Sequence, residues 1–265
     1  MIIDFAFVLV VLLALSGAIL LLDRLWLRAR RPAGAREPVP VDYARSFFPV
    51  ILLVLVLRSF LYEPFRIPSD SMMPTLVQGD FIFVNKWRYG LRLPVVNTRI
   101  VDIGSPERGD VIVFRKPTEP SVTFIKRLVG LPGDVIRVTE RGVFVNGTPL
   151  PVRMNGLYEG PKESLYPFTV VAAEQLGSAD HRIMLDPARP AALGEWRVPE
   201  GHYFFMGDNR DDSADSRFPV AAGGVGMLPA EYLIGRADRI MFSSAGRSLF
   251  FFWTWRADSF FKAIE

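Results

Sequence analysis

Cysteine is absent from all 265 residues of the chain. This absence excludes disulfide bonds, thiolate nucleophiles and zinc sites built on cysteine. Histidine is almost as scarce, since only His181 and His202 occur. A histidine-rich metal site is therefore excluded, and a Ser/His/Asp triad would have to use one of these two residues. We expect neither a metal ion nor a cofactor.

The chain also lacks a large excess of charge of either sign. The formal net charge is only +3, which does not indicate a nucleic-acid-binding surface, and we expect no nucleic acid partner. The basic residues are nearly all arginine. Few positions can therefore hold a catalytic lysine, and the five lysines are Lys86, Lys116, Lys126, Lys162 and Lys262.

What the chain has in excess is hydrophobic residues, and these concentrate near the N-terminus. Half of the sequence is hydrophobic, and Phe5–Leu22 is an almost unbroken apolar run, long enough to cross a hydrocarbon core about 30 Å thick. A cleaved secretory signal would carry positive charge before such a run. Here Asp4 precedes it and arginines follow it. We therefore expect an uncleaved transmembrane anchor at residues 1–23, with a basic cytoplasmic loop at residues 24–45.

A second apolar run, Phe47–Leu61, is shorter and contains Arg58. A buried core helix of the following domain is one interpretation. A second membrane span at residues 46–64 is the other, because Arg58 lies near one end, where its long side chain can reach the interface. Aromatic residues typical of a membrane interface also gather there, namely Phe60, Tyr62 and Phe65. We expect the span, which returns everything after Phe65 to the outside.

Beyond the apolar runs the sequence favours β-structure. Short β-rich runs alternate with turn signals, and the clearest runs are Phe81–Val84, Val111–Phe114, Phe124–Val129, Val135–Val138, Val143–Val145, Tyr203–Met206 and Leu233–Met241. Three of them follow a Gly–Asp pair, at Gly79–Asp80, Gly109–Asp110 and Gly133–Asp134. Asn146–Gly147 suits a type I′ hairpin turn. No amphipathic helix of convincing length appears after Phe65.

The fold class that we predict is mainly β: two N-terminal transmembrane helices followed by an all-β extracytoplasmic domain. Residues 65–138 and 200–265 would form this domain. Residues 139–199 are expected to form a smaller inserted β-rich lobe, because the stretch from Met154 to Pro199 is richer in proline, glycine and alanine and has weaker periodicity. The aromatic tail Leu249–Trp255 is either a core strand or a membrane-surface contact.

Three segments carry residues suited to chemistry, and the first runs from Pro68 to Leu76. Two prolines there bracket Ser69 and Ser71, so the segment is neither a regular helix nor a central strand. Catalytic nucleophiles often lie in such rigid, exposed segments. Serine-rich loops without catalytic function are common as well.

The second segment is the expected strand around Lys126. Period-two alternation puts Lys126 on the same face as Phe124 and Leu128. An ammonium on an apolar face is desolvated, which lowers its pKa and suits the lysine to act as a general base. An edge strand whose lysine reaches out to water is the alternative.

The third segment, residues 207–217, is an acidic loop. Four aspartates within eight residues suggest a calcium site. The EF-hand spacing fails, however, because neither Asp208 nor Asp211 as first ligand puts glycine at the sixth position. A loop held by Asp–Arg pairs through Arg210 and Arg217 is the better interpretation.

Taken together and in order, these motifs resemble bacterial signal peptidase I, the leader peptidase family. The resemblance covers roughly residues 47–138 and 200–240. Two N-terminal spans flanking a basic loop also fit. The matching segments are Arg58–Leu76, Gly79–Lys86, Arg108–Phe114, Phe124–Asp134 and Gly207–Arg217.

The resemblance implies a membrane-bound serine endopeptidase that removes signal peptides by cutting after small residues. Ser71 takes the position of the nucleophile and Lys126 that of the general base. Ser213 corresponds to the hydroxyl that hydrogen-bonds and orients the lysine. Ser69 corresponds to a side-chain donor of the oxyanion hole, assisted by the backbone N–H of Ser71.

The resemblance also implies a set of supporting residues. Asp208 and Arg127 are expected to be structural residues near the site, and Asp215 with Arg217 matches a structural ion pair. Shallow pockets for small substrate side chains would be lined by Ile67, Pro68, Met72, Leu76, Phe124, Ile125 and Ala214. Asp70 departs from the family, which usually has a small residue there, and its charge would raise the pKa of Lys126.

The expected partners are exported preproteins, bound through the signal peptide region, and the lipid bilayer. We expect a monomer near the secretion channel, in the bacterial inner membrane, with the catalytic domain on the periplasmic side. A second hypothesis is a catalytically inactive, membrane-tethered β module that binds exported proteins; the intact set of Ser71, Lys126, Ser69 and Ser213 argues against it. A third is a self-cleaving Ser/Lys repressor, but two apolar runs occupy the place of its DNA-binding helices.

Overall fold

The computed structural model describes residues 5–32, 36–92, 99–101, 103–244 and 255–264. The chain divides into two compact units, and each is described by itself. The first comprises Met1–Glu63 and Gly90–Ile103, and the second comprises Pro64–Tyr89 and Gly104–Glu265.

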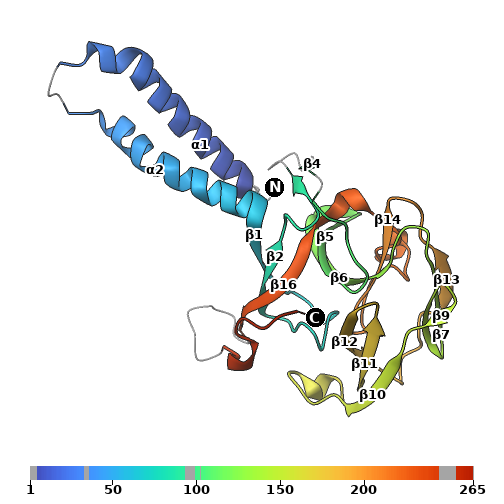
Figure 1. The fold of residues 1–265 in the computed structure, drawn as a ribbon. Helices are drawn as coiled ribbons and strands as arrows, with labels where there is room; N and C mark the ends of the chain where they lie inside the picture. The colour runs from blue at the N-terminus through green and yellow to red at the C-terminus, as the bar shows by residue number, and fades with distance from the viewer. Residues whose placement is uncertain (1–4, 33–35, 93–98, 102, 245–254, 265) are drawn as a thin grey trace. The chain divides into compact units, whose positions relative to one another are not determined.

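Two long helical stretches dominate the first unit, and they lie side by side as an antiparallel pair (Figure 1). The first stretch is α1 (Phe5–Leu22), continued by η1 (Asp23–Leu27) and η2 (Arg28–Arg30); the second is α2 (Val39–Val56), continued by η3 (Leu57–Leu61). Both are long and apolar enough to cross a membrane, and only 11% and 17% of their most apolar windows is buried. Such exposure is unlike that of a core helix, so the two predicted apolar helices are confirmed.

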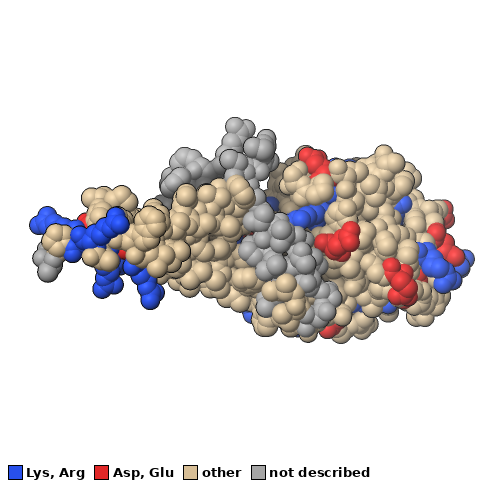
Figure 2. Space-filling model, turned by 90° about the horizontal axis from the view of Figure 1, so that it is seen from above, with Lys and Arg blue, Asp and Glu red and all other residues tan. Residues whose placement is uncertain are grey.

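The second helix begins earlier than the sequence pattern predicted. It starts at Val39, within the residues expected to form a loop, with Pro40 in the first turn. Proline is favourable there because its missing N–H would have no helical partner in any case. Cationic side chains gather at the connecting end of the helix pair, whereas the rest of the pair is largely uncharged on the face that Figure 2 shows. At the other end of this helix, Arg58 donates a 2.7 Å hydrogen bond to Glu63. A short pair of strands, β3 (Leu91–Arg92) and β4 (Arg99–Val101), completes this unit.

The second unit is built on a seven-stranded sheet in the order β1-β2-β16-β5-β6-β14-β15. Its strands are β1 (Tyr62–Arg66), β2 (Asp80–Asn85), β5 (Val111–Lys116), β6 (Glu119–Gly130), β14 (His202–Met206), β15 (Leu228–Pro229) and β16 (Leu233–Ser243). The pairs from β2 to β15 are antiparallel.

Two smaller sheets belong to the same unit, in the orders β13-β7-β8-β9 and β10-β11-β12. Their strands are β7 (Val135–Thr139), β8 (Gly142–Val145), β9 (Thr148–Pro149), β10 (Val152–Leu157), β11 (Val170–Leu176), β12 (Ala179–Leu185) and β13 (Gly194–Arg197). Within the described part of this unit, no helix exceeds three residues; the short helices are η4 (Glu163–Leu165), η5 (Val220–Ala222), η6 (Ala230–Tyr232) and η8 (Ala257–Ser259). The prediction of a mainly β fold is confirmed, and the seven runs named from the sequence correspond to β2, β5, β6, β7, β8, β14 and β16.

The strand β5 explains why the core sequence is continuously apolar. Val111 and Val113 pack into one hydrophobic cluster, whereas Ile112 and Phe114 pack into another. Alternate side chains of a strand point to opposite faces, so a strand buried on both faces needs an unbroken apolar run. Full burial of each such side chain stabilises the fold by roughly 1.5–3 kcal/mol. The strand β5, buried on both faces, is therefore a stable partner for β6, with which it pairs.

The three Gly–Asp pairs form the same turn three times. Each glycine has a positive φ, of +95° at Gly79, +98° at Gly109 and +87° at Gly133. Glycine is favoured there because a side chain would be strained. Each following aspartate accepts a hydrogen bond from the N–H three residues before it, namely those of Val77, Glu107 and Leu131. The prediction of a recurrent turn is confirmed.

The predicted hairpin turn is also present. Asn146 and Gly147 have φ of 52° and 81°, as a type I′ turn requires, and they join β8 to β9. The aromatic tail lies outside the described residues except for Trp255, whose ring stacks on Phe242 with centroids 4.7 Å apart.

Candidate active site

Ser71 lies in a tight turn between β1 and β2. The N–H of Met73 donates to the carbonyl of Asp70, and that of Leu76 donates to Met72, each at 3.0 Å. This turn sends its apolar side chains into the core beneath. Met72, Leu76 and the preceding Ile67 therefore belong to a buried cluster and do not line the groove described below, which differs from the expectation that they form substrate pockets.

Ser71 and Lys126 are in direct contact. The Nζ of Lys126 lies 2.5 Å from the Oγ of Ser71, and the Oγ of Ser69 lies 3.3 Å from the same hydroxyl oxygen. Among the described residues, these two side chains are the partners of the Ser71 hydroxyl, and neither histidine is one of them. The structure thus joins three of the four residues that the sequence singled out as catalytic.

Lys126 comes from β6 and is only 4% exposed. Its Nζ lies 5.4 Å from the centre of the Phe124 ring, on the face of the strand that the sequence predicted. Burial lowers the pKa of Lys126 from 10.5 to about 8; the carboxylates of Asp215 and Asp208 act against this decrease, and Arg217 adds to it. A lysine with such a pKa is partly neutral near physiological pH, so its nitrogen can accept a proton.

A groove of about 490 Å³ opens in front of the Ser71–Lys126 pair. Four of the residues that were predicted to bind substrate line it, namely Pro68, Phe124, Ile125 and Ala214. The sequence reasoning missed Gln78, Val122, Thr123 and Asp212 as lining residues. Val122 and Thr123 could have been found, because they precede Phe124 on the same strand. Asp212 could have been found in the same way, because it precedes Ser213 and Ala214 in the acidic loop, whereas no local pattern indicates Gln78.

Ser213 differs from its expected arrangement. It is 8% exposed, and its hydroxyl has no hydrogen-bond partner among the described residues, so the expected bond to Lys126 is not formed. Gly207 brings it close to the nucleophile. A Cβ atom on Gly207 would lie 2.3 Å from the Oγ of Ser213 and 2.5 Å from the carbonyl oxygen of Ser71. Glycine at this position lets the acidic loop approach the turn of Ser71.

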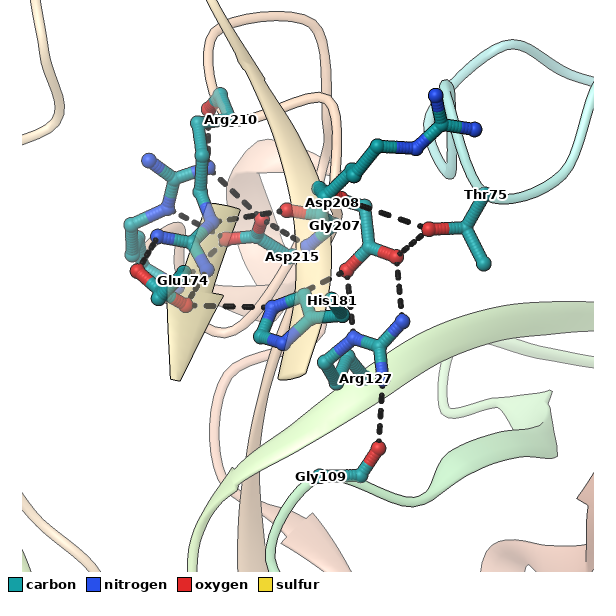
Figure 3. Close-up of polar contacts among 11 residues, drawn as sticks. Thr75, Gly109, Arg127, Glu174, His181, Gly207, Asp208, Arg210 and Asp215 are labelled. Carbon is teal, nitrogen blue, oxygen red and sulfur yellow. Dashed lines mark hydrogen bonds and ion pairs between the residues drawn. The ribbon is translucent and has the colours of Figure 1, made fainter. Parts of the chain in front are cut away.

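A buried ion pair supports both halves of the site (Figure 3). Arg127, next to Lys126, donates to the two carboxylate oxygens of Asp208 at 2.8 and 2.7 Å and to the carbonyl of Gly109 at 2.8 Å. Thr75, in the turn of Ser71, donates to the same carboxylate at 2.5 Å. Burial would raise the pKa of Asp208, but Arg127 and the hydrogen bonds keep it low. Sequence reasoning named Asp208 and Arg127 as structural residues without pairing them.

Two further ion pairs hold the acidic loop, one within it and one to a distant strand (Figure 3). Arg217 binds Asp215 at 2.9 and 2.8 Å, as the sequence suggested. Arg210 pairs instead with Glu174 of β11, outside the loop, and His181 of β12 lies 3.3 Å from that glutamate. Burial disfavours the charge of Glu174, but Arg210 and His181 outweigh it and lower its pKa to about 2. Local spacing could not reveal a partner 36 residues away.

Residues 41–242 match the family described as signal peptidase, peptidase S26. The chain belongs to this family. It is 42% identical to signal peptidase I of Pseudomonas fluorescens over 91% of this chain and 92% of that protein. Signal peptidase I of Pseudomonas aeruginosa is also 42% identical, over 92% of this chain and 93% of the relative. A crystal structure of signal peptidase I from Enterococcus faecalis is 28% identical and covers 51% of this chain and 98% of that one, with a TM-score of 0.30.

This member of the signal peptidase family is accordingly a peptidase. Asp70, which was expected to raise the pKa of Lys126, pairs with a different lysine. Its carboxylate forms an ion pair with Lys162, whose Nζ lies 2.9 and 2.7 Å from the two oxygens. The carboxylates that raise the pKa of Lys126 are those of Asp215 and Asp208, not the expected Asp70.

Proposed function

We propose that this chain removes N-terminal signal peptides from exported preproteins by cutting after small residues, with Ser71 as nucleophile and neutral Lys126 as general base. Family membership supports the reaction. The single observation that carries the assignment of the pair is the 2.5 Å contact between Lys126 Nζ and Ser71 Oγ in a buried setting.

The proposed chemistry begins when neutral Lys126 accepts the proton of Ser71. The Oγ of Ser71 then attacks the carbonyl carbon of the scissile bond, and the lysine returns the proton to the leaving amine. The mature protein departs with this new amino terminus. A water molecule, losing its proton to Lys126, attacks the acyl-enzyme; the bond to the Oγ of Ser71 breaks, the lysine returns the proton to this oxygen, and the signal peptide leaves with a new carboxylate. Lysine thus performs the task that histidine has in other serine peptidases.

The developing oxyanion needs hydrogen-bond donors. The Ser69 hydroxyl, 3.3 Å from the Oγ of Ser71, and the backbone N–H of Ser71 are the proposed donors. Loss of one such donor typically lowers the rate by about 10²–10³. Ser213 has a buried hydroxyl without a partner among the described residues, which supports a role in orienting Lys126 once substrate excludes water.

The groove supports a preference for small side chains. Pro68, Phe124, Ile125 and Ala214 line it beside the nucleophile, and Ile125 also belongs to a buried hydrophobic cluster of the domain. A large substrate side chain beside these four apolar residues would have to displace them.

The proposed location is the bacterial inner membrane, with the catalytic domain on the periplasmic side. The two apolar helices and the arginines of their connection support this topology, because basic loops remain in the cytoplasm. Exported preproteins and the bilayer are the proposed partners, and the protein would act as a monomer near the secretion channel. Within the domain, residues 65–138 and 200–265 would form the catalytic part. Residues 139–199, which hold the strands β8 to β13, would form the inserted lobe.

The test is cleavage of a purified preprotein by the full chain in detergent. Ser71→Ala and Lys126→Ala are expected to abolish cleavage, and Lys126→Arg should fail too, because a guanidinium does not release its proton at accessible pH. Matched controls are Ser178→Ala, in an exposed turn, and Lys262→Ala, which are expected to leave cleavage unchanged. Full activity of Ser71→Ala would refute the pair. An inactive wild-type chain that still binds preprotein would favour the non-catalytic β module.

A further inference from the structure

Residues 158–169, which connect β10 to β11, form a strap over the turn of Ser71. The strap closes on itself through a 2.8 Å hydrogen bond from the N–H of Tyr158 to the carbonyl of Thr169. The rings of Tyr158 and Tyr166 meet edge to face, with centroids 6.4 Å apart, and both belong to the buried cluster that contains Met73. The strap is therefore packed against the segment that carries the nucleophile.

Lys162 extends from this strap to the groove. Its Nζ binds both oxygens of Asp70, at 2.9 and 2.7 Å, and the Oε1 of Gln78 at 2.6 Å. An ammonium has three N–H donors, so these three acceptors use all of them. The backbone of Lys162 has a φ of +64°, a conformation that non-glycine residues seldom adopt. Such a conformation persists where surrounding contacts hold it, and here it points to a specific task for the side chain.

Both acceptors of Lys162 line the substrate groove. Asp70 stands between Ser69 and Ser71, and Gln78 also donates to the carbonyl of Pro68 at 2.9 Å. The side chains of the ion pair are 19% and 30% exposed for Asp70 and Lys162, so a substrate can approach them. The pair thus belongs to the wall along which a preprotein would lie.

The other carboxylate on this wall is compensated in the same way. Asp212 lines the groove, pairs with Arg189 at 2.9 Å and accepts a hydrogen bond from Tyr166 at 3.1 Å. Lys162 and Arg189 are not themselves among the residues that line the groove. Each carboxylate that lines the groove is therefore neutralised by the cationic side chain of a residue that does not line it.

We propose that Lys162 is a specificity-determining residue that masks the charge of Asp70, so that the groove accepts acidic and basic substrate residues equally where the preprotein passes Asp70. The inference rests on the proposed function and extends it to substrate selection. An unmasked charge in a partly desolvated groove attracts an opposite charge and repels a like one, which creates discrimination by electrostatics alone.

The experiment measures kcat and KM of the full chain in detergent on a set of peptides that span one cleavage region. The peptides differ only in carrying Lys, Gln or Glu at one of the first three positions after the scissile bond or of the first three before it. The variants are Lys162→Met, Asp70→Asn and the double variant. Lys262→Met is the matched control, because it removes the same charge away from the groove.

At the position that faces Asp70, the wild-type chain should cleave the Lys and Glu peptides equally well. Lys162→Met should shift the ratio of kcat/KM about tenfold towards the Lys peptide, mainly through KM, and Asp70→Asn should shift it about as far towards the Glu peptide. The double variant should restore the wild-type ratio, and added salt should weaken both shifts. A purely structural ion pair predicts the same change in both single variants, so the opposite signs identify a masked charge.

Unchanged ratios in active Lys162→Met and Asp70→Asn enzymes would overturn this proposal and leave the proposed function intact. Should Lys162→Met fail to fold, Asp70→Asn provides the decisive ratio by itself. A wild-type chain that cleaves none of the peptides and no preprotein would refute both proposals.

Discussion

The hydroxyl of Thr75 lies 2.5 Å from the carboxylate of Asp208, and the same carboxylate binds Arg127 through two hydrogen bonds. Thr75 is four residues from Ser71, and Arg127 is adjacent to Lys126. One buried carboxylate therefore fixes the spacing of the two segments that carry the proposed nucleophile and base. The distance between Ser71 and Lys126 depends on this shared partner as well as on the strands.

Asp208→Asn is expected to destabilise the fold strongly. The substitution leaves the buried guanidinium of Arg127 without its counter-charge, which typically costs about 3–5 kcal/mol. Thr75→Val removes one hydrogen bond to a charged group and should cost about 2 kcal/mol. Urea unfolding of the full chain in detergent, followed by tryptophan fluorescence, measures both. Glu107→Gln, in an exposed pair with Arg88, is the control and should change stability by less than about 1 kcal/mol. Equal effects of Asp208→Asn and Glu107→Gln would contradict this view of the ion pair.

The pH dependence of cleavage should report the protonation of Lys126. Because burial lowers the pKa of this lysine to about 8, the base is protonated and inactive below that pH. The value of kcat/KM should rise with pH, with a midpoint near 8, and level off above it. A pH–rate profile with a preprotein substrate measures this midpoint. A midpoint close to 10.5, the ordinary value for lysine, would show that burial does not tune the base.

Lys126→Met should make the fold more stable while it abolishes activity. The pKa of Lys126 is lower in the folded chain than in the unfolded one, so at neutral pH the native state bears the cost of a buried charge. Stability of the wild-type chain therefore rises as pH increases from about 8 to 10.5. The gain from Lys126→Met should be on the order of 2 kcal/mol at pH 7 and should shrink over that interval. Urea unfolding at several pH values tests this, with Lys262→Met as the control; a loss of stability would contradict it.

Gly207→Ala should disrupt the site through a steric clash. The added Cβ would lie 2.5 Å from the carbonyl oxygen of Ser71 and 2.3 Å from the Oγ of Ser213, so the acidic loop would have to move away. A shift of about 1 Å can lower the rate by about 10²-fold. The measurement is kcat on a preprotein. Gly201→Ala is the control, since it has open space around its Cβ but a φ of +71°; it should lose some stability and keep its kcat. Normal kcat for Gly207→Ala would show that the close approach is unimportant.

Most of the strand pattern could be predicted from the sequence because it depends on local chemistry. The apolar run at Val111–Phe114 predicted β5. The glycine of each Gly–Asp pair predicted a turn, because the positive φ of that turn is unfavourable for other residues. The long apolar runs predicted the two helices, again from local chemistry. The start of the second helix at Val39 was missed, since residues 24–45 were expected to form a loop, although Pro40 is favourable in a first helical turn.

The composition of the sequence excluded a cysteine nucleophile and left only two histidines and five lysines for catalysis, and the resemblance of its ordered motifs to signal peptidase I then selected Ser71 and Lys126. Only the tertiary structure decided which of the other side chains are buried and which partners they contact. It buried Ile67 in the core, left the Ser213 hydroxyl without a partner among the described residues and paired Asp70 with Lys162, 92 residues away. The physical reason is that burial and ion pairing depend on which segments meet in space, whereas residue type and periodicity are properties of the chain itself.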